Sequence, residues 1–556
     1  MLLALGMIAS CGGSGKTAGA DGGAANGGGG ATGGHGGSGS GGAPGTDGGG
    51  PGPGSSLLTL PGESVLMHHK NPSRDGMYVE PTLTKSAIGG LKQDTNFDPV
   101  LTNAGEIYAQ PLFVDGGAGG TDLVIVATES NNVYALDAVT GAQAWMVNLG
   151  TPLPLAQAMC GNLDLYGVTG TPAIDLDSRR LFVDAVVIPS GNAAIPTHMI
   201  FALSIDTGAV AAGWPIDVTV ASMTTTTAFT PATTGQRGAL TIADGFLYVP
   251  FGGLFGDCGT YNGGVLGVSI SDPTMIQTWR TAYNGGGLWA PGGLASESIY
   301  IYGATGNTCM PKAGINGCPP GKPGDSQGWG GGEGLVRFGT AGAFVGAPAY
   351  FAPTNWPSLD GFDQDMAAGP VLFNLAGSTP GQLAIQLGKD GNAYLLDRTN
   401  LTGVGSAIGG SGTTYWSFHA ATNEIISSPV VYGTPTATYV AFKGNGAACT
   451  GGTSGSLTAL RVVPGSPPSL AASWCAPAGT GSPMVTTSDG TNDAIVWVPG
   501  AESGNKLQAF DGDTGASITF IGGSLTIPNM RRYNAPIAAK GRIFVAADNA
   551  LVAFTL

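Results

Sequence analysis

Cysteine is the residue type in this 556-residue chain whose chemistry is easiest to assign. Cys11 lies near the start, and six others follow: Cys160, Cys258, Cys309, Cys318, Cys449 and Cys475. An even number of cysteines outside the cytoplasm predicts disulfides, although the pairing stays open. We expect Cys309 to pair with Cys318 across a short Gly/Pro-rich loop, Cys160 with Cys258, and Cys449 with Cys475. Metal binding is the alternative, but no spacing matches a zinc site.

The histidines offer less chemistry than the cysteines. His68 and His69 are adjacent and could hold a metal ion, but we interpret them as a surface pair before the first strand. No arrangement of serine, histidine and aspartate suggests a nucleophilic hydrolase. No Cys-x-x-Cys-His haem motif occurs, so any electrons released at a site would need a separate acceptor.

The composition limits the kind of fold that can position such residues. Charged residues make up 10% of the chain, glycine contributes 98 residues, and 42% of residues are hydrophobic. Low charge, abundant glycine, threonine and valine, and few helix formers favour an all-β protein rich in turns. The formal charge of −15 would repel phosphate backbones, so we expect no nucleic-acid partner.

The N-terminal region has the pattern of an exported and anchored protein. Residues 1–11 form a short apolar stretch ending in Ile8-Ala9-Ser10-Cys11, which resembles a bacterial lipobox with Cys11 as the lipidation site. An ordinary cleaved signal with a coincidental cysteine is the alternative. Residues 12–56 are glycine-rich and predict a disordered tether. We therefore expect an extracytoplasmic monomer held by a lipid anchor only, at the outer membrane or cell surface.

Residues 57–556 consist of repeats. The sharpest unit, 135–145, reads Ala-Leu-Asp-Ala-Val-Thr-Gly-Ala-Gln-Ala-Trp, and weaker copies occupy 202–208 and 509–515. Each copy predicts a strand, a tight turn closed by Asp and Thr-Gly, and a further strand. A second element places proline in a strand of small residues, which suits an innermost edge strand. The spacing of about 40 to 70 residues is typical of propeller blades.

The number of repeats predicts an eight-bladed β-propeller of four-stranded antiparallel blades, with seven blades as the fallback. Complete units begin near residues 106, 166, 236, 286, 366, 425 and 480. The last unit runs from Asn534 to Leu556 and holds only about three strands. We expect residues 91–101 to supply its outer strand and so to close the ring without an exposed edge.

The repeat resembles that of pyrroloquinoline quinone (PQQ) proteins, and the resemblance covers most of residues 57–556. This family contains quinoprotein alcohol dehydrogenases and propellers without catalytic activity. For the dehydrogenases, the resemblance implies a strand ending in Gly-Asn that binds calcium, here at Asn307. It implies a catalytic base at Asp363 or Asp365, a quinone-contacting cation at Lys389, and an aromatic platform at Trp289.

Other features depart from the dehydrogenase pattern. The calcium-binding glutamate is missing, and Asp257 is the nearest substitute, with Asp363 as a further metal ligand. Only Cys160 stands where many members have two adjacent cysteines. Without the resemblance, each of these residues has an ordinary structural interpretation. Asn307 would be a turn or cap residue, and Asp363 and Asp365 would be loop carboxylates. Lys389 would be a solvated residue beside an Asp390-Gly391 hairpin turn.

Two functions therefore remain open. The first is a lipid-tethered propeller that binds an envelope protein or a polysaccharide and carries a degenerate quinoprotein site. The second is a PQQ- and calcium-dependent alcohol or sugar dehydrogenase. We favour the binding or scaffold function on the sequence, because the missing glutamate and cysteine pair weaken the case for catalysis.

Overall fold

The computed structural model describes residues 63–189, 196–223, 230–308, 329–340, 344, 348–405, 416–447, 449, 455–502 and 504–556. All of them belong to one compact unit, Pro51–Leu556. Within these ranges no helix has the length and apolarity needed to cross a bilayer. Cys11, the predicted tether and the predicted pair Cys309 and Cys318 lie outside the described residues.

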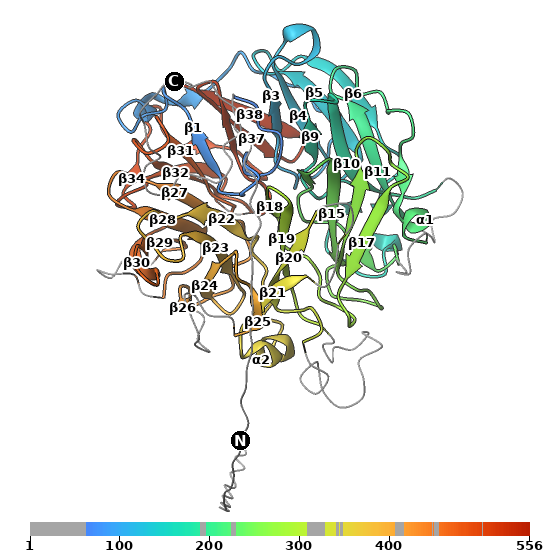
Figure 1. Ribbon diagram of the computed structural model, residues 1–556. Helices are drawn as coiled ribbons and strands as arrows, with labels where there is room; N and C mark the ends of the chain where they lie inside the picture. Colours follow the sequence, from blue (N-terminus) through green and yellow to red (C-terminus); the bar gives the residue numbers. More distant parts are fainter. Residues whose placement is uncertain are drawn as a thin grey trace, which may run out of the picture. The chain divides into compact units, whose positions relative to one another are not determined.

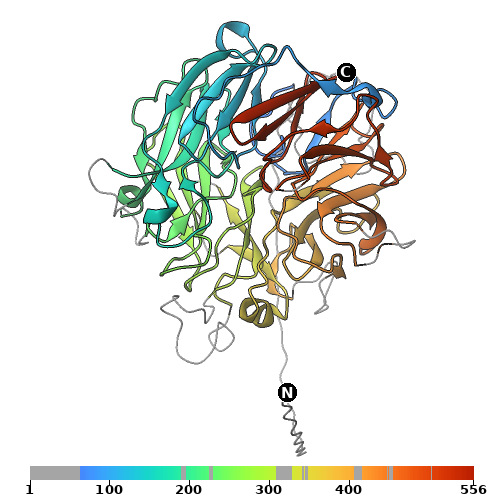
Figure 2. The same cartoon turned by 180° about the vertical axis from the view of Figure 1, so that it is seen from behind.

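Eight antiparallel sheets of four principal strands stand around a common axis, as in an eight-bladed β-propeller (Figures 1 and 2). This confirms the fold and the blade number predicted from the repeats. In each blade the strands follow one another in sequence from the axis outward, except at the point of ring closure.

The strands of blades 1 to 4 are short and mostly buried. They are β3 (Leu112–Val114), β4 (Leu123–Ala127), β5 (Asn132–Asp137) and β6 (Gln143–Asn148); β9 (Ala173–Asp175), β10 (Arg180–Val187), β11 (Thr197–Ser204) and β12 (Ile216–Asp217); β14 (Thr241–Ala243), β15 (Phe246–Gly253), β16 (Gly264–Ser269) and β17 (Ile276–Arg280); and β18 (Ala295–Glu297), β19 (Tyr300–Thr305), β20 (Gly334–Gly339) and β21 (Ala349–Ala352).

Blades 5 to 8 repeat the plan. They are β22 (Val371–Asn374), β23 (Gln382–Leu387), β24 (Asn392–Asp397) and β26 (Trp416–His419); β27 (Val430–Gly433), β28 (Thr438–Lys443), β29 (Leu457–Val463) and β30 (Ser469–Ala476); β31 (Met484–Thr487), β32 (Ile495–Pro499), β33 (Lys506–Asp511) and β34 (Ser517–Ile518); and β36 (Ile537–Ala539), β37 (Arg542–Ala547), β38 (Ala550–Thr555) and β2 (Lys92–Gln93).

Short elements decorate the connections between these strands. They are β1 (Met77–Val79), β7 (Leu153–Pro154), β8 (Leu165–Tyr166), β13 (Thr234–Gly235), β25 (Thr402–Val404), β35 (Leu525–Thr526), α1 (Val218–Met223), α2 (Trp356–Gly361), and single 3₁₀ turns at Ile88–Gly90, Ala118–Gly120 and Leu155–Gln157.

The Asp-x-x-Thr-Gly repeat forms the turn between the third and fourth strands and also joins neighbouring blades. Oδ1 of Asp137 accepts the backbone N–H groups of Val139 and Thr140 at 2.9 and 2.7 Å. Trp145, which ends the unit, donates its indole N–H to the carbonyl of Ile205 in blade 2 at 2.9 Å. Its ring lies against Gly208, whose φ is 72° and which has no room for a Cβ. The repeat therefore specifies both the turn and the contact between blades.

The ring closes as predicted, through an outer strand supplied from the N-terminal side of blade 1. Strand β2 pairs antiparallel with β38, and Lys92 lies opposite Thr555. Blade 8 is thereby completed to four strands, and its outer edge is protected.

The axis is filled by an N-terminal stretch, residues 63–80, which we call the axial segment. Its backbone carbonyl groups accept hydrogen bonds from backbone N–H groups of the innermost strands of six blades, all at 2.8–3.0 Å. The donor and acceptor pairs are Phe113 and Val65, Ile174 and Leu66, Ser296 and Pro72, Leu372 and Ser73, Val431 and Asp75, and Val485 and Gly76. Most of these donors lie two residues after an inner-strand proline. Apart from β31, which pairs with β1, the inner strands are edges of their sheets, as the prolines predicted, and the axial segment covers most of these edges.

The axial segment also overturns the interpretation of His68 and His69 as a surface pair. Both side chains are buried, with 1% and 0% exposure, and their rings stack with centroids 4.3 Å apart. Burial lowers the pKa of both imidazoles, to about 4 for His69. A metal ion must lie in the plane of each ring that binds it, so rings stacked in this way cannot share one.

Candidate functional site

A cavity of about 500 Å³ opens at one end of the propeller axis. Two kinds of loop lie at this end of the propeller and line the cavity. One kind leads into the inner strand of a blade, and the other joins the second and third strands of a blade. Trp289, Asp257, Asp363, Asp365 and Lys389 all line the cavity. The structure therefore brings these predicted site residues together, although blades 3, 4 and 5 supply them.

Lys389 and the two aspartates form the charged wall of the cavity. Asp363 and Asp365 follow α2, and Lys389 lies in the turn between β23 and β24. The ammonium nitrogen of Lys389 lies 3.3 Å from Oδ1 of Asp363 and contacts Oδ2 of Asp365. Burial alone would lower the pKa of Lys389, but the attraction of Asp365 and Asp363 outweighs burial and raises it. Lys389 is therefore a fixed cation and not the solvated residue of the alternative interpretation.

Asn307 follows β19 and meets these carboxylates from the neighbouring blade. Its backbone N–H donates to Oδ1 of Asp365 at 2.8 Å. In the orientation that satisfies all groups, its side-chain amide donates to Asp363 at 3.3 Å and also to Asp365. Gly306 permits this approach, since a Cβ there would overlap Asp365 and the Trp289 ring.

Trp289 separates the charged wall from an arginine that the sequence analysis missed. The Nε–H of Arg237 donates to the Trp289 carbonyl at 2.7 Å. The guanidinium carbon lies 5.4 Å from the Trp289 ring centroid and 4.8 Å from that of Tyr533. Among the described residues, no carboxylate lies within ion-pair distance of Arg237. It is thus a preorganised cation facing the cavity, and only the tertiary contacts identify it.

Asp257 lies on the side of the cavity nearest the disulfide. Its carboxylate accepts the phenol O–H of Tyr261 at 2.8 Å, and burial followed by the charge of Asp257 raises the pKa of Tyr261. The Tyr261 ring stands edge-on to Trp289, with centroids 6.0 Å apart. Asp257 therefore helps to position the Trp289 platform, and the carboxylates that contact Asn307 are those of Asp363 and Asp365.

Two buried carboxyl groups behind the cavity were also missed as site residues. Glu333, fully buried, has no hydrogen-bond partner for either side-chain oxygen among the described residues. Burial first, and then the charges of Asp365 and Asp360, raise its pKa well above the usual range. Asp360, also buried, accepts the backbone N–H of Thr308 at 2.5 Å, and burial raises its pKa to about 7. In the sequence, only the Gly-rich run before Glu333 could have suggested that this part of the chain is special.

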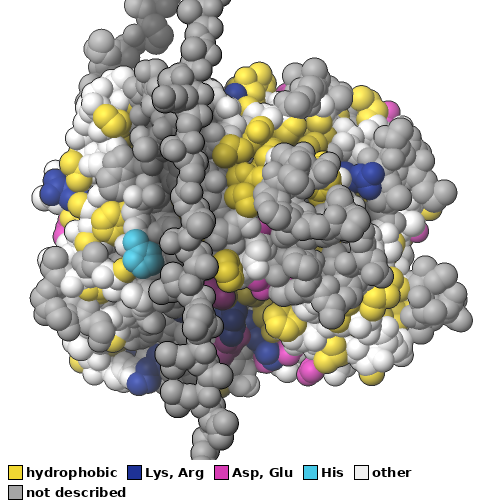
Figure 3. Space-filling view, turned by 90° about the horizontal axis from the view of Figure 1, so that it is seen from below, with side chains coloured by type: hydrophobic (Ala, Val, Ile, Leu, Met, Phe, Trp, Pro, Cys, Tyr) yellow, Lys and Arg dark blue, Asp and Glu magenta, His cyan; other side chains and the backbone are white. Residues whose placement is uncertain are grey.

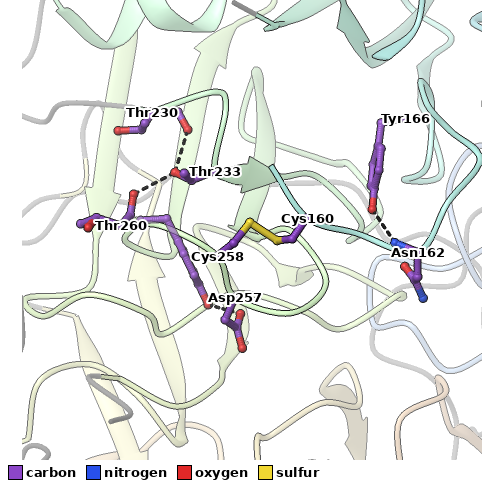
Figure 4. The surroundings of a disulfide bond; sticks show 9 residues. Cys160, Asn162, Tyr166, Thr230, Thr233, Asp257, Cys258 and Thr260 are labelled. Carbon is purple, nitrogen blue, oxygen red and sulfur yellow. Dashed lines mark hydrogen bonds between the residues drawn. A yellow bond between two sulfur atoms is a disulfide. The ribbon is translucent and has the colours of Figure 1, made fainter. Parts of the chain in front are cut away.

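The disulfides Cys160–Cys258 and Cys449–Cys475 are present as predicted, with Cα–Cα distances of 6.0 and 5.8 Å. The second staples blade 6. The first joins the loop that holds Cys160 to the loop that holds Cys258 and the cavity-lining Asp257 (Figure 4). Figure 3 shows Lys or Arg and Asp or Glu side chains side by side in a hollow of the face seen from below, with hydrophobic side chains spread over the rest of that face.

The site suits a flat anionic cofactor better than a metal ion. Trp289 contributes an aromatic ring to the cavity lining, and Arg237 and Lys389 contribute cations to the same lining. The oxygens of Asn307, Asp363 and Asp365 are of the type that calcium prefers. However, no three His, Cys, Asp or Glu residues of the described ranges are grouped so as to hold a metal ion, and Lys389 already forms ion pairs with both aspartates.

The comparisons with known proteins support the fold. No family model and no curated protein sequence matches the chain. A quinohemoprotein alcohol dehydrogenase from Comamonas testosteroni matches with a TM-score of 0.58 and 12% identity, over 88% of this chain and 80% of that one.

Two further solved structures are similar to the same degree. A quinohemoprotein alcohol dehydrogenase from Pseudomonas putida HK5 gives a TM-score of 0.57 and 14% identity over 89% and 80% of the two chains. A europium-containing methanol dehydrogenase gives 0.56 and 15% over 87% and 90%. At these identities the likeness shows a shared quinoprotein dehydrogenase-like propeller fold and no more.

Proposed function

We propose that the axial cavity binds a quinone cofactor of the PQQ type and that the protein oxidises an alcohol or a sugar. One observation carries the proposal: Trp289, the Asp363 and Asp365 pair and Lys389 come from three separate segments yet line one cavity, and Asn307 bonds to Asp365. When bound, the quinone would accept the hydride equivalent from the substrate carbon, and a separate protein or small molecule would then take the electrons.

Residues of the chain would position the ligands, take the proton of the alcohol and stabilise negative charge. Both oxygens of Asp365 are engaged, one by the Asn307 N–H and the other by Lys389, so Asp365 positions its neighbours. The Asp363 side chain is 36% exposed and lines the cavity, which makes it the carboxylate that takes the alcohol proton. Lys389 holds its charge where negative charge would develop on the bound ring.

Arg237 supports the choice of an anionic ligand. The other cations of the cavity are paired, Lys389 with the two aspartates and Arg532 with Glu502. Arg237, in contrast, is fixed by its contacts with Trp289 and Tyr533 and has donors left for a ligand carboxylate.

Titration of the purified full-length protein with PQQ, with and without calcium, tests this proposal by calorimetry and absorbance. Near-stoichiometric binding would support a quinone-dependent dehydrogenase, and a requirement for calcium would show that an added ion completes the oxygen ligands around Asn307. The absence of binding at high micromolar PQQ would overturn the proposal.

The second candidate is a propeller that binds an envelope protein or a polysaccharide while tethered by a lipid on Cys11. The ion pairs of Lys389 with both aspartates favour it, since a cation already paired within the protein gains less from an anionic cofactor. Crosslinking at the cell envelope is the measurement for this candidate.

A further inference from the structure

His198 is a buried histidine that does not line the cavity, and its ring joins two blades. The residue is 0% exposed and lies in β11 of blade 2. Nδ1 of the ring lies 2.7 Å from Oδ2 of Asp184 in β10, and Nε2 lies 3.0 Å from the backbone carbonyl oxygen of Thr234, in the connection into blade 3. A carboxylate and a carbonyl group only accept hydrogen bonds, so both ring nitrogens must donate. The geometry therefore requires an imidazolium.

The groups packed around the ring stabilise its positive charge. Asp184 is 2% exposed, so solvent screens its charge little. Asp217 of β12, which accepts the Thr197 hydroxyl at 2.9 Å, adds a further negative charge. The ring of Phe251 in β15 stands edge-on to the imidazole, with centroids 5.3 Å apart. Burial alone would lower the pKa of His198, but the charge and hydrogen bond of Asp184 and the bond to the Thr234 carbonyl outweigh burial and raise it.

Thr234 connects His198 to the cavity. Residues 234–237, which we call the Arg237 segment, begin with β13, and β13 pairs with the end of β15. The last two residues of the segment, Gln236 and Arg237, line the cavity. Three residues span at most about 11 Å, so a shift of the Thr234 carbonyl is passed directly to Arg237. The bond from His198 thus anchors to blade 2 the segment that presents the Arg237 guanidinium.

We propose that His198 is a positioning residue that holds the Arg237 segment in its binding geometry, and that this hold weakens as the pH rises. The effect on ligand binding rests on the proposed function, because Arg237 is the cation that we assign to a ligand carboxylate. A neutral imidazole carries a single N–H group. The carboxylate of Asp184 retains that group, since a charged acceptor forms the stronger hydrogen bond. The Thr234 carbonyl then loses its donor, and the anchor between the blades is released.

The direction of the pH effect follows from the raised pKa of His198. The folded chain binds this proton more tightly than the unfolded chain, in which the imidazole has its ordinary value of 6.5. The contribution of the imidazolium to stability is therefore complete below about pH 6.5 and is lost as the pH rises through the higher pKa of the folded chain. A guanidinium keeps its charge over this range. A change in ligand affinity through His198 thus reports the position of Arg237.

Nitrogen-15 NMR of the full-length protein labelled at histidine tests the charge of the ring. The chain has five histidines, and His198→Gln identifies the His198 signals by their loss. At pH 7 His198 should show two protonated ring nitrogens. His68 and His69 should both be neutral there, because burial lowers the pKa of each ring. A neutral His198 ring at pH 6.5, or a ring still charged at pH 10, would overturn the proposal.

The affinity for PQQ tests the positioning role. At pH 6.5, His198→Gln should bind PQQ up to about tenfold less tightly than the wild-type protein, the loss expected for one hydrogen bond from a charged group. At a pH where NMR shows the wild-type ring to be neutral, the two proteins should differ little. His419→Gln is the matched control, since His419 is exposed and does not line the cavity. An affinity ratio that is the same at both pH values would contradict the positioning role.

A second variant keeps the test available if His198→Gln does not fold. Asp184→Asn retains the imidazole but removes the charge that holds its proton. The loss of PQQ affinity should then occur at a lower pH than in the wild-type protein. The same pH dependence in both proteins would count against the ion pair as the source of the effect.

Hydrogen exchange separates this inference from the proposed function. In the cofactor-free protein, the amide groups of residues 234–237 should lose protection when the His198 ring becomes neutral, after correction for the intrinsic effect of pH on exchange. If PQQ does not bind but protection falls in this way, the proposed function falls and the anchor stands. If PQQ binds but neither protection nor the affinity ratio changes with pH, the inference about His198 falls alone.

Discussion

Asn307 and Asp365 come from neighbouring blades, and the backbone N–H of Asn307 donates to Oδ1 of Asp365 at 2.8 Å. Because Lys389 contacts the other oxygen of the same carboxylate, Asp365 links the end of β19 to the hairpin between β23 and β24. This arrangement separates the two aspartates into a positioning residue and a residue that can reach the substrate.

The two aspartates should therefore respond differently to amidation. Asp363→Asn should lower kcat by about 10²- to 10⁴-fold, because the proton acceptor is lost, with little change in PQQ affinity. Asp365→Asn should weaken PQQ binding as well, since Lys389 loses its main partner. Calorimetry and single-turnover kinetics measure the two effects, and identical profiles for both variants would refute the division of roles.

Removal of the cavity lysine should weaken both cofactor binding and the fold. Lys389→Ala removes a half-buried cation, and we expect PQQ affinity to fall about tenfold or more; the thermal unfolding midpoint should fall too, because the buried Asp365 loses its ion-pair partner. Lys540→Ala is the control, because Lys540 pairs with Asp115 and Asp122 at exposed positions away from the cavity. Unchanged affinity in Lys389→Ala would count against the site.

Buried Glu129 should make the protein less stable as the pH rises. Burial raises its pKa to about 8, against 4.5 in the unfolded chain. Between these values the folded state holds a proton that the unfolded state has released, so the free energy of unfolding falls with rising pH. Glu80, with a pKa raised by burial to about 7, acts in the same direction.

Urea denaturation between pH 5 and pH 8 tests this linkage. In Glu129→Gln the proton difference between the two states should shrink by about one, which flattens the dependence on pH. Asp489→Asn serves as the control, since Asp489 is exposed and hydrogen bonds lower its pKa to about 2, outside this window. A slope that Glu129→Gln leaves unchanged would show that other groups carry the dependence.

Arg74 should be essential for holding the axial segment in place. Its guanidinium donates to the carbonyls of His68, Leu240 and Leu294 at 2.7–2.9 Å and to the Thr241 hydroxyl. Arg74→Met should lower stability by several kcal/mol, because hydrogen bonds to charged groups contribute about 1.5–3 kcal/mol each.

Thermal unfolding of Arg74→Met and of Arg179→Met gives the comparison. Arg179 pairs with Asp206 at an exposed position, where such pairs contribute about 0–1 kcal/mol. Similar losses in the two variants would mean that the axial segment adds little to stability.

The lipidation that we propose at Cys11 predicts the distribution of the protein between cell fractions. Cys11→Ser in the full chain should move it from the membrane fraction to the soluble fraction, because the anchor is the only membrane contact we propose. Fractionation and immunoblotting detect the shift, with Cys449→Ser as a control that removes a different cysteine. Membrane association that persists in Cys11→Ser would exclude a lipid on this residue as the anchor.

The sequence by itself determined the features that depend on local, repeated signals. The Asp-x-x-Thr-Gly turn, with Trp145 at its end, identified the blades because each copy must form the same turn and meet the same neighbour. The incomplete unit after Asn534 predicted the closing strand, since β-strand edges need partners. The even number of cysteines predicted disulfides, and the two expected pairs within the described residues are present.

The tertiary structure alone decided the features that depend on contacts between distant segments. The axial segment pairs with blades throughout the ring, and Arg74 bonds to Leu240 across 166 positions, so no local period reveals the contact. Likewise the stacking of Arg237 on Trp289 and Tyr533, the burial of Glu333 and the different exposure of Asp363 and Asp365 arise only when the blades meet at the axis. The sequence states the charge and the length of each side chain, but packing sets the partners of that side chain and its exposure to water.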